Sequence, residues 1–231
     1  MLHLSASWEE EYMQRCNGLG SNNGNLPTPQ DLRTLVGGKI DLWYFQSPKN
    51  KCRFVLCGEL LFLLAVALEA DKDILSYAPC DDVQDAEMEG NGPHIRAKNI
   101  HGGTVEFRTV RTRGKRGPKA APTSRSAASG IVVITDEWLY ERRVLLDNWI
   151  FLLAAINRVR KTPWFHEAEI LHDTLSKTHG CTLGHLLALT EIDVANMLGA
   201  VADALQRRTV KFDTATYPLT LLSLIEPGES S

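Results

Sequence analysis

The residues of this chain that could do chemistry include a carboxylate at the start of an apolar helical pattern. Glu59 opens the segment ELLFLLAVALEA. Carboxylate oxygens are ligands that Mg²⁺ prefers, and a bound Mg²⁺ can activate water for phosphodiester hydrolysis. An acid in the first helical turn is also favourable for electrostatic reasons alone. A catalytic Glu59 would therefore need partners. Spare carboxylates occur in a loose acidic segment, for which a solvated loop is the better interpretation, at Asp81, Asp82, Asp85, Glu87 and Glu89.

A second group of candidate functional residues is basic. Between Glu106 and Asp136 the sequence contains no acid, although the net charge of the chain is −3. Such a local concentration of cations predicts contacts with phosphate groups. Its Gly, Pro and Ser content is also typical of a disordered loop, and both interpretations hold if the loop orders on nucleic acid. The residues that we predict to contact DNA are Arg108, Arg111, Arg113, Lys115, Arg116 and Lys119.

The bulk properties exclude several classes of protein. With 231 residues, of which 44% are hydrophobic, the chain can bury a core in one large domain or two small ones. Its longest apolar run, from Leu60 to Leu68, is shorter than the roughly 20 residues that cross a bilayer. The five cysteines lack a metal-binding spacing, and no secretory leader is evident. We expect a cytoplasmic protein that does not contact a membrane.

The elements that must position these residues form an α/β pattern. Glu59 starts a helix that is expected to end near Ala70, because its apolar residues recur at the spacing of a helix face. The run GIVVIT is typical of a central strand that is buried on both faces. Thr135 or Asp136 is expected to cap the helix that follows. The other strands are expected at residues 40–45, 53–56, 74–79, 94–98 and 104–111, the last two forming a hairpin that turns at Gly102-Gly103.

The C-terminal third reads as a separate module. After a helix over residues 146–159, Lys161-Thr162-Pro163 is the expected boundary. Helices over 164–177, 182–189 and 192–207, with two strands at 209–212 and 219–224, indicate a winged-helix-like module containing a helix-turn-helix pair. The alternative is a helical cap on the first domain. We therefore divide the chain into a poorly patterned segment 1–36, an α/β domain 37–160 and a winged-helix-like domain 164–226.

The order of these motifs resembles the TnsA family, the endonuclease subunit of heteromeric transposons. The resemblance covers roughly residues 39–225 and rests on SPKN, KCRFVL, GELLFLLAVALEAD, DILSYAP, the hairpin, GIVVITDEWL and LLDNWIFLLAAINR. It implies a restriction-endonuclease-like mixed sheet flanked by helices, of the PD-(D/E)xK type. In that family a helix Glu, a hairpin Asp and a Gln/Glu-x-Lys pair hold the metal. Glu59 matches the helix Glu.

The remaining family positions are replaced in this chain. The Asp position falls near His94, and the last pair falls near Thr109 and Arg111. Imidazole is a poor Mg²⁺ ligand, a threonine brings no carboxylate, and a guanidinium cannot act as a base at neutral pH. Glu106 lies three residues before Thr109, so strand alternation turns it to the other face. The resemblance therefore implies a degenerate site without a metal cofactor.

The favoured hypothesis is a TnsA-like pseudonuclease that binds DNA and assembles a transposase complex. The resemblance implies two protein partners, a TnsB-like transposase and a TnsC-like AAA+ ATPase that contacts residues 164–226. Two alternatives stay open. In the first, acids such as Asp82 or Glu87 rebuild a Mg²⁺ site and the chain cuts the 5′ ends of the element. In the second, the chain is a winged-helix DNA-binding regulator.

Overall fold

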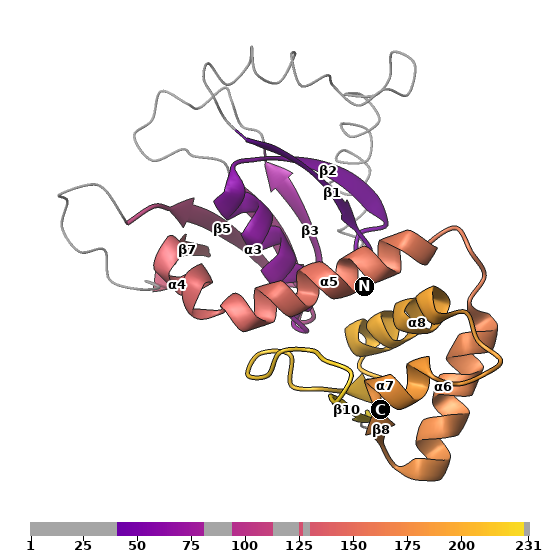
Figure 1. Ribbon diagram of the computed structural model, residues 1–231. Coiled ribbons are helices and arrows are strands. Elements are labelled where there is room, and N and C mark those ends of the chain that lie inside the picture. The colour runs from indigo at the N-terminus through magenta and orange to yellow at the C-terminus, as the bar shows by residue number, and fades with distance from the viewer. Residues whose placement is uncertain (1–40, 81–93, 113–124, 127–129, 229–231) are drawn as a thin grey trace, which may run out of the picture.

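The computed structural model describes residues 41–80, 94–112, 125–126 and 130–228 (Figure 1). The predicted N-terminal segment 1–36 and the acidic segment between Asp81 and Glu89 lie outside these ranges. Within them, no helix is long and apolar enough to cross a membrane.

A five-stranded mixed sheet forms the centre of the α/β part, with the order β3-β4-β5-β7-β6. Its first three strands are an antiparallel meander, β7 runs parallel to β5, and the short β6 pairs with β7. The predicted α/β class with a mixed sheet is thus confirmed. The bounds are β3 (Ile74–Cys80), β4 (His94–Asn99), β5 (Thr104–Val110), β6 (Arg125–Ser126) and β7 (Ile131–Thr135).

Helix α3 (Glu59–Ala70) has the bounds expected from its apolar spacing. It contacts β3, β4 and β5 on one side, and other parts of the chain cover the rest of its surface. This explains its composition, because a helix that is apolar all round is buried all round. The helix follows Gly58, whose φ of 88° lies in the region that glycine adopts readily.

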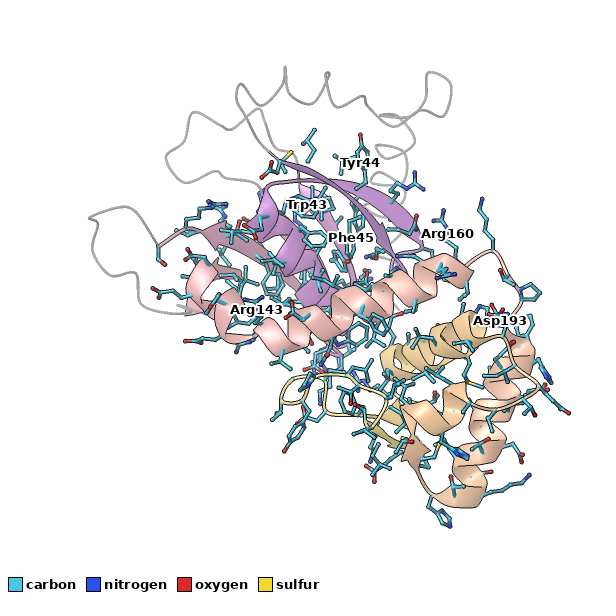
Figure 2. All side chains as sticks on the ribbon, viewed as in Figure 1. Trp43, Tyr44, Phe45, Arg143, Arg160 and Asp193 are labelled. Carbon is cyan, nitrogen blue, oxygen red and sulfur yellow. The ribbon has the colours of Figure 1, made fainter. Side chains whose placement is uncertain are left out.

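A separate hairpin packs on α3. It consists of β1 (Leu42–Ser47) and β2 (Cys52–Cys57), paired in antiparallel register. Trp43 stacks on Phe62 of α3 with ring centroids 4.4 Å apart, and Phe45 meets the same ring edge-on at 5.9 Å. Tyr44 points to the opposite face, as strand alternation requires (Figure 2).

Helices α4 (Asp136–Glu141) and α5 (Arg143–Val159) follow β7. Thr135 is the N-cap of α4, because its hydroxyl accepts a hydrogen bond from the Trp138 backbone N–H at 3.1 Å. Helix α5 starts at Arg143, three residues earlier than its apolar pattern indicated. It crosses the molecule beside α3 and reaches the C-terminal elements (Figure 1).

The C-terminal part contains three helices and a small antiparallel sheet with the order β8-β10-β9. The prediction of a strand over residues 219–224 was wrong, since β10 begins at Leu224. The preceding loop is hydrogen-bonded instead to Asn148 of α5. The Asn148 side-chain NH₂ donates to the carbonyls of Thr214 and Tyr217, and its Oδ1 accepts from the Leu219 N–H. The bounds are α6 (Phe165–Thr178), β8 (Cys181–Thr182), α7 (Leu183–Leu187), α8 (Val194–Arg207), β9 (Val210–Lys211) and β10 (Leu224–Pro227).

One hydrophobic core runs across the predicted boundary at Pro163. Helix α8 packs along α5, and buried residues of both belong to the same cluster, including Leu152 and Val201. Before that boundary, two hydrogen bonds link the end of α5 to the β1–β2 hairpin, from Asn157 to the Gln46 carbonyl and from Arg160 to the Gln46 side chain. The division at Pro163 stays a prediction, and the two parts share a packed interface.

A buried carboxylate also joins the two parts. Glu69, near the end of α3, is 1% exposed and accepts hydrogen bonds from the hydroxyls of Ser47 and Tyr77. Its second oxygen accepts from the Lys49 N–H at 3.2 Å and from the Gln206 amide of α8 at 2.6 Å. Burial raises the pKa of this carboxyl. Four donors, two from the β1–β2 hairpin and one each from β3 and α8, therefore converge on one side chain.

Lys49 makes the stability of this region pH-dependent. Its ammonium donates to the carbonyls of Leu68 and Asp71, yet burial lowers its pKa from 10.5 to about 8, against the opposing effects of Glu69 and Asp71. Between these values unfolding takes up a proton, so the contribution of Lys49 to the free energy of unfolding rises with pH.

We therefore expect the free energy of unfolding of wild type, minus that of Lys49→Met, to increase between about pH 8 and pH 10.5. Urea titrations at several pH values measure this difference. Lys72→Met, a change at an exposed lysine at the same end of α3, is the control against which the rise for Lys49→Met is compared. A flat difference for Lys49→Met would contradict the assignment.

Candidate functional site

The first candidate residue, Glu59, lies at the edge of the sheet where β5 ends. The carboxyl ends of β5 and β7 meet at this edge because the two strands are parallel. Glu59 is the first residue of α3, and Arg111 follows the last residue of β5. The Glu59 Oε2 and Arg111 Nη2 atoms are 4.0 Å apart, and their side chains are 60% and 67% exposed. The structure thus brings these two predicted positions together, as an open ion pair that adds little to stability.

Thr109 belongs to the row of β5 that faces α3. Its register partner on β7 is Ile134, which is 2% exposed, and the preceding member of its row, Phe107, packs against the core. The Thr109 hydroxyl therefore adds no charge to the sheet edge at which Glu59 and Arg111 meet.

His94 lies on the other face of the sheet. It pairs across the hairpin with Arg108, so it is one residue out of step with Thr109, and a shift of one residue reverses the face. Its Nε2 atom is 4.0 Å from Glu106 Oε1, which also accepts a 2.6 Å hydrogen bond from Arg108 Nε. His94, Glu106 and Arg108 therefore form a group apart from Glu59 and Arg111.

The residues at this edge do not fit a Mg²⁺ site. In the described part of the chain, no cluster of three or more His, Cys, Asp or Glu residues could hold a metal ion. The neighbour of Glu59 is a cation, whereas Mg²⁺ needs several converging oxygens. Asp136 also lies at this edge, but its Oδ1 is occupied by hydrogen bonds from the Thr112 N–H at 2.9 Å and the Thr112 hydroxyl at 2.5 Å.

Asp136 also has a positioning role. The sequence predicted it only as a possible cap of the helix that follows. By binding Thr112, it fixes the point at which the chain leaves β5 and enters the basic stretch. The two residues are 24 positions apart and carry no local motif, so no sequence signal pointed to this contact. Of the predicted DNA contacts, Arg113, Lys115, Arg116 and Lys119 lie outside the described residues.

The β4–β5 hairpin adds cations that were not predicted. Arg96 and Lys98 alternate with the buried Ile95 and Ala97, so they share the outer face of the sheet with His94. Arg108 lies on the same face through its pairing with His94. The period-two spacing of His94, Arg96 and Lys98 could have revealed this row. Together with Arg111 at the edge, it makes the hairpin predominantly basic and suited to contacts with phosphates.

Helix α8, the second helix of the predicted helix-turn-helix pair, is covered by α5. A Cβ atom added at Gly199 would lie 2.3 Å from Val159 Cγ2, so the two helix backbones are in close contact. Arg207 is the cation of the helix itself, and its Nε bonds to Asp203 at 2.7 Å. The C-cap residue Arg208 donates to the Lys72 carbonyl at 2.6 Å. The helix therefore has no free basic face for a DNA groove.

No protein-family model matches the chain, and the search of curated proteins found no match either.

Proposed function

We propose that this chain is a non-cleaving, DNA-binding subunit of a transposase complex, similar to the TnsA family. The observation that carries the proposal is the Glu59–Arg111 pair. A guanidinium stands beside the one acid that matches the family pattern, where a nuclease of this type needs a metal ion. The charge of Arg111 can meet a DNA phosphate without the chemistry of hydrolysis.

The sheet topology supports a restriction-endonuclease-like scaffold. A helix precedes an antiparallel meander of three strands, and a fourth strand lies parallel to the third. Glu59 and Arg111 meet at the edge of this sheet, which is where the motif order suggested that an active site would be.

The C-terminal elements support a winged-helix-like module. The order is helix, strand, two helices and two strands, and the last strand, β10, pairs with both β8 and β9. Because α5 packs over α8, we disfavour the hypothesis that the chain is a DNA-binding regulator that inserts α8 into a DNA groove. It favours a module that contacts proteins, with TnsB-like and TnsC-like partners as the candidates.

The test is cleavage and binding of labelled element-end DNA, with and without the co-encoded transposase. We expect binding without added metal, and no cut by this subunit in Mg²⁺ or Mn²⁺. Glu59→Gln should bind DNA more tightly, since it removes a negative charge next to the phosphate-binding Arg111. Mn²⁺-dependent cutting at 5′ ends that is lost in Glu59→Gln would instead identify a working nuclease.

Arg111→Gln should weaken DNA binding and lower the slope of log affinity against log salt by about one, as expected for one lost phosphate contact. Arg207→Gln is the matched control, because Arg207 is 70% exposed and is also paired with an acid. It should leave both affinity and slope unchanged. Equal effects of the two substitutions would remove the edge of the sheet as the binding site.

A further inference from the structure

The exposed side chains of α5 lie on one face of the helix. The helix crosses the front of the molecule in Figure 1, and its buried residues pack against α3 and α8. The exposed residues recur at helical spacing, so they form a continuous line along the other side. We call this line the exposed stripe, and it consists of Arg143, Asp147, Ile150, Phe151, Ala154 and Arg158.

The centre of the exposed stripe is apolar and uneven in size. Ile150 and Phe151 are large side chains, yet they are 38% and 49% exposed. About one helical turn further on, the stripe continues with the small Ala154. Beside it, a groove of about 540 Å³ opens between α5 and the start of α8, with Ala155 and Leu198 among its lining residues. A bulky half of the stripe therefore adjoins a small half that is bordered by a groove.

An acid and a base stand on opposite sides of this apolar centre. Asp147 precedes it and forms an open ion pair with Arg143, in which the Nε and Oδ2 atoms are 3.4 Å apart. Arg158 follows it, about three turns further along the helix. Among the described residues, no ion pair involves Arg158. Its guanidinium is therefore available to a carboxylate of another molecule.

The exposed stripe is complementary to itself when its direction is reversed. Two copies of α5 can pack antiparallel about a two-fold axis that lies level with the midpoint between positions 152 and 153. Residues equally far from this axis then face each other, and each such pair occurs twice. Asp147 faces the partner's Arg158, and Phe151 faces the partner's Ala154 beside the groove. Each acid thus meets a base, and each large side chain meets a small one.

We propose that the exposed stripe binds a second copy of this chain, with the two α5 helices antiparallel. Contact with a different protein would not require the stripe to be its own complement, whereas a two-fold contact does. The apolar centre supplies the affinity, and the charges fix the register, because exposed ion pairs stabilise little but mismatched charges are costly.

The dimer is expected to be weak and to depend on concentration. A single helix face is small beside the roughly 800 Å² that each partner buries in a standard interface. The inference does not rest on the function proposed above, because DNA takes no part in this contact.

The experiment is sedimentation velocity of the full chain without DNA, from about 1 µM to about 300 µM, a range that covers weak association. We expect the monomer to be replaced by a dimer within this range. Asp147→Arg should raise the dissociation constant of the dimer by at least about tenfold, because it creates two pairs of like charge. Arg158→Asp should have the same effect. An equimolar mixture of the two variants should dimerise again, since position 147 of each then faces the opposite charge at position 158 of the other.

Asp173→Arg is the matched control. Asp173 is also an exposed acid with a base four residues later, Lys177 at 2.6 Å, but it lies on α6. Its replacement should leave the dissociation constant unchanged, and circular dichroism should show that all variants are folded. A chain that stays monomeric over the whole range would overturn the proposal. So would a dimer that neither charge reversal at α5 weakens, or a mixture of the two variants that stays monomeric.

Discussion

Replacing Glu69 by alanine is expected to lower the free energy of unfolding by about 3–5 kcal/mol. This is the range found when one partner of a buried charged pair is removed and its hydrogen-bond donors stay buried. The carboxylate accepts four hydrogen bonds, and two of the donors, Ser47 and Tyr77, are at most 1% exposed. In the variant these hydroxyls would stay buried without their acceptor. The loss would also remove the hydrogen bond that ties Gln206 of α8 to α3.

Urea unfolding of the wild type, Glu69→Ala and Glu169→Ala measures this effect. Glu169 is a helical glutamate on the exposed side of α6, so its replacement should change the free energy of unfolding little. Glu69→Gln should fall between the two, because it keeps one acceptor oxygen but places an amide against the Gln206 donor. Equal stabilities of Glu69→Ala and Glu169→Ala would mean that the network does not hold the two parts together.

Local signals in the sequence predicted the elements of the fold well. The bounds of α3 follow from the apolar period, and the cap at Thr135 follows from the hydroxyl that precedes two acids. The start of β10 was predicted wrongly, because the residue that holds the preceding loop is distant in the sequence. Asn148 binds the loop from 66 to 71 residues away, and nothing near Leu219 indicates that its backbone is engaged.

The candidate site could be predicted only in part. The resemblance in motif order implied that Glu59 and Arg111 share one site, and the structure places their side chains 4.0 Å apart. The face on which His94 lies depends on the register His94↔Arg108, which differs by one residue from a pairing with Thr109. The Glu69 network was beyond prediction, since Gln206 is 137 residues away in the chain.

A single added methyl group is expected to have a large effect at Gly199. An alanine there would place its Cβ 2.3 Å from Val159 Cγ2, well inside van der Waals contact. Val159 is 3% exposed and β-branched, so its rotamer cannot change freely within α5. We expect Gly199→Ala to lower the free energy of unfolding by about 2–3 kcal/mol, as overpacking of a core does. Without the clash, alanine would instead stabilise the helix by about 1 kcal/mol.

A double-mutant cycle separates these two effects. In the Val159→Ala background the contact is relieved, and Gly199→Ala should then be stabilising, which reverses the sign of the single change. Ala195→Gly, at a half-buried position of the same helix, is the reference for an alanine-to-glycine exchange elsewhere in α8. If Gly199→Ala stabilises the wild type, α8 is not packed on α5, and its surface becomes available to DNA. If the sign reverses as expected, α8 is held in the protein core, and the proposed DNA contacts lie outside this helix.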